Sequence, residues 1–418
     1  MRRVNRGSAQ PTVRGALSRT WATVAVSLAL GAATVQAIDT GEVYFDTFFA
    51  GETTDDKIAA MNTWNAGFSA RDPRPTVVFN AVEYRFSTPI QLWSGLSLRG
   101  SSARAVREYT TGTSFKWNGP DGTSVFVFTG SQTGQGYPRD GSPRNITMEN
   151  ILFRGTPTTH FLPKHDPTTY PTHGRSHVLW MSTFHNVGWK DFATIAWGWW
   201  DGVTISGTVH FQGVHDTAFY LGGSENNVFG DGFSFGDSDN GFGVVTAGKP
   251  VFRSIMSKSR IGRIMLTARK AAYPLSIEGG KGLLVEGTAF DAQDSDPMYG
   301  SVIRISGGEG IRISHCSFKG GMTNPDGASG GAVANRAWIT ITGGRQIVIQ
   351  GSDFQRAGNS PPSTTTPLVW VSPAVDVREV KWGLNTATGY AGAPAVIAEG
   401  ASGRIVNIDP SVSLVVEP

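Results

Sequence analysis

The sequence lacks several features that define common protein classes. Its 418 residues include a single cysteine, Cys316, which excludes an internal disulfide framework. No basic stripe is visible that would favour nucleic acid as a partner. The one long apolar run, 21–35, is too short for a comfortable membrane span. Glycine, in contrast, is abundant with 53 residues, and together with a hydrophobic content of 39% this favours a turn-rich all-β protein over a disordered chain.

The first 37 residues differ from the remainder of the chain. They hold five arginines and the apolar run, but no lysine and no acidic residue. The segment ends in Val-Gln-Ala, which resembles a signal-peptidase site. We therefore predict that 1–37 is a signal peptide or, alternatively, an uncleaved segment that attaches the protein to a virion. Without it, 31 basic and 33 acidic residues remain, so the net charge falls from +3 to −2.

The region from Pro274 to Arg356 repeats one pattern three times. Each copy has alternating apolar residues, a short Gly-containing turn, a second alternation, a bend and a closing Phe; the copies span 275–290, 303–318 and 339–354. Alternation with a period of two indicates strands, and no helical period competes with it. Recurrence after 28 and then 36 residues indicates the coils of a solenoid that carries inserts.

Shorter versions of the pattern occur upstream at 146–153, 203–211 and 228–235. Positions one and three of the pattern should point into the core, and positions two and four outward. The fifth position mostly holds a residue that tolerates a left-handed backbone, so we expect a bend at Asn150, Gly207, Gly232, Gly287, His315 and Gly351. The closing rings are expected to stack inside the coils: Phe153, Phe211, Phe235, Phe290, Phe318 and Phe354.

This pattern resembles the right-handed parallel β-helix of the pectate-lyase superfamily, which includes polygalacturonases, pectate lyases and bacteriophage tailspikes. Residues 53–64 predict a helix with Thr or Asp as its N-cap, and in that superfamily such a helix caps the open N-terminal end. The predicted fold class is therefore all-β, a single-stranded right-handed parallel β-helix with an N-terminal capping helix. The predicted parts are 1–37 (leader), 38–100 (cap and first coils), 101–367 (body) and 368–418 (C-terminal coils or cap).

The run 39–49 and the helix after it are also similar to minor tail proteins of actinobacterial phages, as are the runs 222–226, 290–295 and 366–369. The resemblance implies an extracellular virion tail protein that binds, with or without cleavage, a polysaccharide of the host cell surface. Its further partners would be other tail proteins, and it could form a homotrimer. Two alternatives stay open, a secreted polysaccharide hydrolase or lyase and a non-catalytic glycan-binding adhesin.

Tryptophan is concentrated between Trp180 and Trp200, where five of these residues fall. The segment Ala-Trp-Gly-Trp-Trp at 196–200 should not bury every ring inside one narrow coil. Exposed rings stack on the apolar faces of sugars, while the others would pack in the core. We predict substrate binding by Trp189, Trp197, Trp199, Trp200 and the nearby His185.

Three aspartates lie close together in a glycine-rich segment: Asp231, Asp237 and Asp239. Crowding raises the pKa of one carboxyl group, so that an acid and a base or nucleophile can act on a glycosidic bond. Turn formation and calcium binding would use the same residue types. The Gly-His-Gly and Arg-x-Lys motifs of polygalacturonases are absent. The histidines at 160, 165, 173, 177 and 185 fit no tight ligand set, so we predict no metal and no cofactor.

Overall fold

The computed structural model describes residues 41–68, 74–101, 103–106, 109–129, 143–168, 178–207, 211–223, 226–230, 250–267, 274–292, 301–320, 337–356, 368–372, 377–388, 395–399, 405–407 and 413–417. Residues Thr40–Pro418 form one compact unit. The predicted leader lies outside the described residues. No helix in the described ranges is long and apolar enough to cross a membrane.

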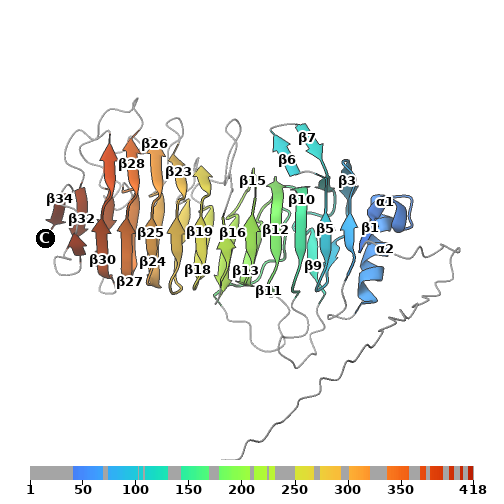
Figure 1. Cartoon of the computed structure of the whole chain (residues 1–418), viewed down its shortest axis with the longest axis horizontal. Helices are drawn as coiled ribbons and strands as arrows, with labels where there is room; N and C mark the ends of the chain where they lie inside the picture. The colour runs from blue at the N-terminus through green and yellow to red at the C-terminus, as the bar shows by residue number, and fades with distance from the viewer. Residues whose placement is uncertain are drawn as a thin grey trace, which may run out of the picture. The chain divides into compact units, whose positions relative to one another are not determined.

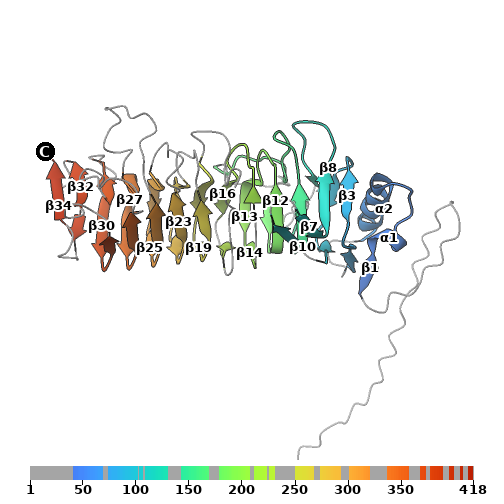
Figure 2. The ribbon, with the colours of Figure 1, turned by 90° about the horizontal axis from the view of Figure 1, so that it is seen from above.

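The body is a parallel β-helix, which confirms the predicted fold class (Figures 1 and 2). Successive coils pair strand on strand, and the strands form three parallel sheets. The first, called sheet 1, contains β1 (Glu42–Tyr44), β2 (Thr76–Val78), β5 (Ser97–Arg99), the starts of β10 (Thr147–Arg154) and β12 (Thr183–Lys190), β14 (Thr204–Ser206), β17 (Val228–Phe229), β19 (Arg260–Gly262), β22 (Leu284–Glu286), β25 (Arg312–Ser314), the end of β27 (Ile339–Gln350), β30 (Arg378–Gly383) and β33 (Ile405–Asn407).

Sheet 2 follows sheet 1 in each coil. It contains β3 (Glu83–Phe86), β8 (Ser114–Trp117), the ends of β10 and β12, and β15 (Phe211–Gln212), and in later coils β20 (Met265–Thr267), β23 (Ala289–Ala292), β26 (Ser317–Gly320), β28 (Asp353–Arg356) and β31 (Thr386–Thr388). An antiparallel hairpin, β6 (Ala103–Val106) and β7 (Tyr109–Gly112), is inserted between β5 and β8.

Sheet 3 completes the coil. It contains β4 (Ile90–Leu92), β9 (Phe126–Phe128), β11 (Val178–Trp180), β13 (Ala196–Asp201), β16 (Phe219–Gly223), β18 (Phe252–Met256), β21 (Leu275–Ile277), β24 (Ile303–Glu309), the start of β27, β29 (Val369–Val371), β32 (Ala395–Glu399) and β34 (Ser413–Glu417).

A single residue with positive φ turns the chain from sheet 1 to sheet 2. The value is 57° at Asn150, 52° at His315 and 62° at Gly351, and Gly207 and Gly287 are also positive. These bends are confirmed, whereas Gly232 lies outside the described residues. Asn is suited to the bend because its short polar side chain tolerates the left-handed region.

The coil that contains β17 is shifted by one residue from the predicted alignment. Phe229 lies opposite Ile205 and is fully buried, so Phe229 takes the third, inward position that the sequence pattern gave to Gly230. Position one is therefore Asn227, which is also fully buried. Its side-chain amide donates to the Trp200 carbonyl at 2.8 Å, and its Oδ1 accepts from the Val203 amide at 3.0 Å.

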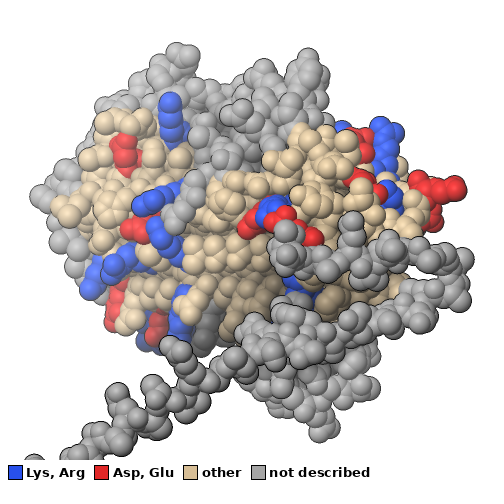
Figure 3. Space-filling model, turned by 45° about the vertical axis from the view of Figure 1, so that its right-hand side comes forward, with Lys and Arg blue, Asp and Glu red and all other residues tan. Residues whose placement is uncertain are grey.

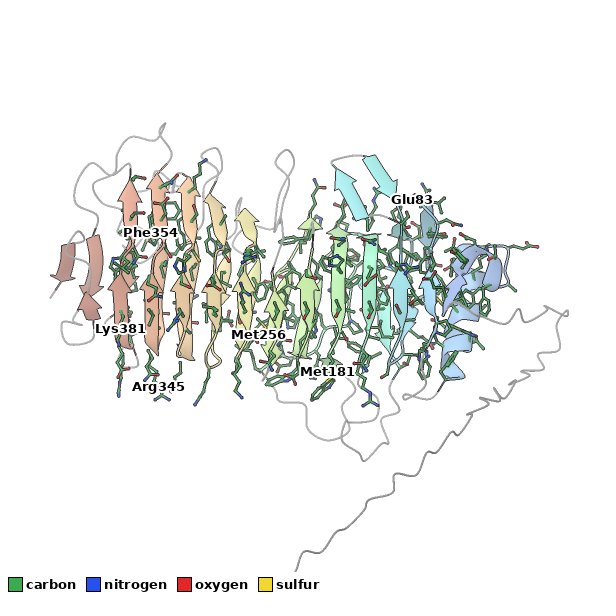
Figure 4. The ribbon with its side chains drawn as sticks, in the orientation of Figure 1. Glu83, Met181, Met256, Arg345, Phe354 and Lys381 are labelled. Carbon is green, nitrogen blue, oxygen red and sulfur yellow. The ribbon has the colours of Figure 1, made fainter. Side chains whose placement is uncertain are left out.

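The interior is filled by rings in register. Phe153 lies opposite Phe115 and Trp189, and Trp189 opposite Phe211. Later in the chain Phe318 stacks on Phe290 with ring centroids 4.9 Å apart and on Phe354 at 4.4 Å. Figure 4 shows Phe354 within its coil. All these rings are at most 1% exposed, so the predicted internal stack is confirmed in the coils described; Phe235 lies outside them.

The N-terminal end is covered by α1 (Phe45–Phe48) and α2 (Thr54–Ala66) (Figure 1). Thr53 and Asp56 form a capping box, since Thr53 Oγ1 accepts from the Asp56 amide at 3.1 Å and Asp56 Oδ2 from the Thr53 amide at 3.0 Å. Asp55 accepts from the amides of Ser87 at 2.7 Å and Thr88 at 2.6 Å, which ties the helix to the turn after β3. The predicted capping helix is confirmed.

We expect Phe318→Ala to lower the free energy of unfolding by about 3–5 kcal/mol, because it removes a ring that is packed on both sides and leaves a cavity. Chemical denaturation measures this. Lys319→Ala, at the exposed neighbouring position of the same strand, is the control and should change the value by about 0.5 kcal/mol or less. Equal losses in both variants would contradict the stacked core.

Candidate functional site

Trp189 and Trp200, two of the predicted sugar-binding residues, are core residues. Trp189 is 1% exposed and Trp200 3%. The Trp200 ring lies between Phe184, at 5.9 Å, and Phe229, at 6.0 Å, and is nearly parallel to both. The prediction that these two rings bind sugar is therefore wrong, because both point inward from their strands.

His185 does not join Trp197 and Trp199. His185 lies on the outer side of sheet 1, where its Nδ1 is 3.0 Å from Ser206 Oγ, whereas Trp197 and Trp199 lie on sheet 3. Asp231, Asp237 and Asp239 lie outside the described residues. Their catalytic role stays a prediction.

Trp197 begins a continuous outward-facing line on sheet 3, which we call the sheet 3 row. The inward neighbours on these strands, such as Leu275, Ile303 and Ile339, are fully buried, so the alternate positions face outward. Pairing places seven of these side chains in register across successive coils: Trp197, Tyr220, Arg253, Ser276, Arg304, Thr340 and Trp370.

Aromatic side chains stand at the two ends of this row, and two arginines lie between them. Trp197 meets Tyr220 edge to face with centroids 5.3 Å apart. The Arg253 guanidinium lies 3.7 Å from the centroid of the Tyr220 ring. Two nitrogens of Arg253 each donate to one oxygen of Glu278 at 2.7 Å, and Ser276 Oγ donates to the same carboxylate at 3.0 Å. These contacts fix the positions of the Arg253, Glu278 and Ser276 side chains, so these side chains need little reordering when a ligand binds.

The ion pair sets the charge state of the row. Burial would raise the pKa of Glu278, but the hydrogen bonds and then the charge of Arg253 outweigh burial, and the pKa lies below its usual range. The carboxylate is therefore ionised at neutral pH. Burial raises the pKa of the Tyr220 phenol, against the opposing charge of Arg253, so the hydroxyl keeps its proton. The row thus holds a fixed acceptor and fixed donors beside the rings, of which Tyr220 is 6% exposed.

A second group of polar residues borders Trp197. The Lys164 ammonium lies 4.4 Å from the centroid of the Trp197 ring and 3.6 Å from Asp216 Oδ2. His160 Nδ1 is 2.8 Å from Thr194 Oγ1. Burial, together with the nearby Lys164, lowers the pKa of His160 to about 4, so its ring is neutral at pH 7.

Trp199 lies outward on the same strand as Trp197. Its Nε1 donates to Asp201 Oδ2 at 3.2 Å, and its ring covers Gly222, where a Cβ atom would approach Trp199 Cε3 to 2.8 Å. Glycine at 222 therefore allows the ring to lie flat on the sheet.

Tyr220, Arg253 and Glu278 were not predicted as site residues. Their outward positions could have been found from the alternation in 219–223, 252–256 and 275–277, but their register could not, since inserts of different length separate the strands. The chemistry of the row offers no metal centre: among the described residues no three His, Cys, Asp or Glu side chains come together as a metal site.

The fold and the row define a parallel β-helix protein with an aromatic and charged outer surface. No protein-family model matches the chain. No curated protein matches it either.

Solved structures share the fold. The chain is similar to DFA-IIIase from Arthrobacter chlorophenolicus A6 without its lid, with a TM-score of 0.51 and 11% identity, covering 90% of this chain and 98% of that one. PfbA, a surface adhesin of Streptococcus pneumoniae, has a TM-score of 0.41 and 9% identity, with coverages of 90% and 89%. ORF18 of Geobacillus virus E2 has a TM-score of 0.38 and 12% identity over 89% of this chain, which spans 62% of that protein. At 11% identity the likeness to DFA-IIIase shows the parallel β-helix fold alone.

We expect His160→Gln to weaken the pH dependence of stability. With a folded pKa of about 4 and a reference value of 6.5, the unfolded state takes up the proton first as pH falls. Wild-type stability is therefore lost between about pH 6.5 and pH 4, and the variant should lose less over this interval. Unfolding curves at several pH values measure the difference. At pH 8 the His160 ring is neutral in the folded and in the unfolded state, so the difference in unfolding free energy between wild type and variant at this pH is the reference. A difference that stays constant down to pH 4 would contradict the lowered pKa of His160.

Asp231→Asn, Asp237→Asn and Asp239→Asn test the predicted catalytic carboxylates. Each substitution keeps the shape and removes the charge. If the protein depolymerises a glycan, loss of the general acid or base should lower the rate about 100-fold or more. Reducing-end release from the cleaved glycan measures this. Activity retained within about tenfold in the triple variant would exclude these residues.

Proposed function

We propose that the protein binds a polysaccharide along the sheet 3 row. The observation that carries this proposal is the unbroken series of contacts from Lys164 through Trp197, Tyr220 and Arg253 to Glu278. Ring faces pack on the apolar faces of sugars, while ionised and polar groups beside them hydrogen-bond hydroxyl groups. Since the contacts are already formed, binding costs little side-chain ordering.

The length of the row favours a polymer over a small sugar. Its seven positions lie on successive coils, and at about 4.8 Å per strand they extend over roughly 29 Å. The polar and aromatic part runs from Trp197 to Trp370, which is 7% exposed, and the register continues with the apolar Ile397. A chain of several sugar units matches such an extended surface.

Binding is better supported than cleavage by the described residues. Hydrolysis of a glycosidic bond needs a carboxyl group that keeps its proton. The carboxyl at the centre of this row, Glu278, has a lowered pKa and holds Arg253 at both oxygens. Glu278 is therefore suited to accept hydrogen bonds, and cleavage depends on the predicted aspartates.

For the biological setting we propose a minor tail protein of a phage, exposed on the virion surface and in contact with other tail proteins. The sequence resemblance in 39–49 and in the capping helix that follows supports this setting. The same resemblance is the basis for proposing a homotrimer. A secreted bacterial hydrolase or lyase, or an adhesin, is the alternative. The mass of the purified native chain distinguishes them: an intact segment 1–37 favours the virion, and cleavage after Ala37 favours secretion.

We expect Trp197→Ala to weaken binding to the recognised glycan about tenfold, because the ring lies at the start of the contact series. Bacterial surface glycans on an array identify the ligand, and calorimetry then measures affinity. The free energy of unfolding should change by about 1 kcal/mol or less, since the ring is only half-buried. Tyr44→Ala removes a ring that is 53% exposed at the N-terminal cap and should leave affinity unchanged. An equal effect of both substitutions, or lost stability with unchanged affinity, would refute the site.

A further inference from the structure

Sheet 2 carries a line of four basic residues in register, which we call the sheet 2 basic row. Arg85 lies opposite Lys116, Lys116 opposite Arg154, and Arg154 opposite Lys190. Their inward neighbours, among them Phe115, Phe153 and Trp189, are buried in the ring stack, so the four basic side chains face outward. The row belongs to the first coils of the body and to a different sheet from the sheet 3 row.

Only part of this positive charge is neutralised within the described structure. Glu83 accepts from Arg85 Nε at 2.7 Å and from Arg154 at 2.9 Å. Among the described residues, neither Lys116 nor Lys190 forms an ion pair. Four cations at intervals of about 4.8 Å, beside the two carboxyl groups of Glu83 and Asp191, repel one another and attract an anion. On the face that Figure 3 draws, basic and acidic side chains lie next to one another.

Apart from Glu83, the outward positions next to the charges carry small or buried side chains. The other outward positions of the same strands hold Ser114 and Leu152, which are 1% and 3% exposed, and the small Gly188. The β6–β7 hairpin packs against β10 and β12. Figures 1 and 4 show this hairpin and the labelled Glu83 at the same end of the body. The side chains of Arg85 and Arg154 are 65% and 28% exposed, so these charges stay accessible beside the hairpin.

The basic row reaches the sheet 3 row at the turn between the two sheets. Lys190 precedes Asp191, a half-buried carboxyl whose surroundings include Arg154 and His215. Asp216, which follows His215 in the sequence, forms the ion pair with Lys164, and Lys164 covers Trp197. The two surfaces are thus linked through the turns of two adjacent coils, Lys190–Asp191 in one and His215–Asp216 in the next, which backbone hydrogen bonds pair with each other.

We propose that the sheet 2 basic row binds an anionic polysaccharide, so that the glycan bound by this protein carries acidic groups. This inference rests on the proposed function, because the basic row is linked to the sheet 3 row and the ligand proposed for the sheet 3 row is a glycan. Nucleic acid fits less well. Single-stranded nucleic acid needs ring surfaces for its bases, and the outward positions of these four strands hold none. Strong binding to phosphates also uses more cations than four.

The test compares two double variants with the same loss of charge. Lys116→Gln/Lys190→Gln removes the two cations of the row that form no ion pair with a described residue. Lys319→Gln/Arg312→Gln removes two exposed cations from later coils, where Lys319 lies opposite Asp291 and Gln355. Affinity is measured for polygalacturonate, for neutral dextran and for poly(dT), at low and at physiological ionic strength.

The row variant should bind polygalacturonate about tenfold more weakly at low ionic strength, the scale of two exposed charge contacts. The difference should shrink as salt screens the charges, and the control variant should stay within about twofold of wild type. Equal losses in both variants, equal wild-type affinity for dextran and polygalacturonate, or tighter binding of poly(dT) would each overturn the proposal.

Trp197→Ala separates this inference from the proposed function. If Trp197→Ala abolishes polygalacturonate binding while the row variant binds normally, the basic row is not part of the site and the sheet 3 row stands. If only the row variant loses binding, the basic row stands and the function proposed for the sheet 3 row fails. Losses in both, with an unaffected control variant, support one polymer that contacts both surfaces.

Discussion

The whole molecule depends on the backbone hydrogen bonds that hold each coil in register with the next. Each parallel strand is fixed one strand spacing from its neighbour, so equivalent positions of different coils become neighbours. Phe290, Phe318 and Phe354 meet for this reason, although 64 residues separate the first from the last. The same register turns single outward residues into rows. Side-chain chemistry on this protein is therefore a property of columns of residues and not of local motifs.

Whether a strand residue points inward or outward decides whether its side chain packs in the core or lies on the outer surface. On β13, Trp197 and Trp199 point outward, while Trp200 points inward and lies between Phe184 and Phe229. All three are tryptophans, and they differ only in the side of the strand to which their position points. A tryptophan-rich segment in such a fold thus contributes to the core and to the surface at once.

Much of the fold could be predicted from the sequence because alternation, bend residues and closing rings recur in every copy. The error at β17 has a physical cause: Asn227 occupies an inward position that is apolar in the copies used for the alignment, and it is accepted because its amide is fully hydrogen-bonded. Trp189 and Trp200 could have been assigned to the core by parity alone. The two outer rows could not have been predicted, because the inserts between paired strands differ in length. Arg85, Lys116, Arg154 and Lys190 are separated by 31, 38 and 36 residues, so they form no basic run along the chain.

Because the rows are built from one residue per coil, their recognition properties are open to stepwise evolution. The inward residues that carry stability and the outward residues that carry charge occupy alternate positions of the same short strands. A single codon change at an outward position can add or remove one cation, or one ring, without a change in the interior. For the polysaccharide binding proposed here, specificity can thus change one coil at a time, while selection on folding acts on a separate set of residues.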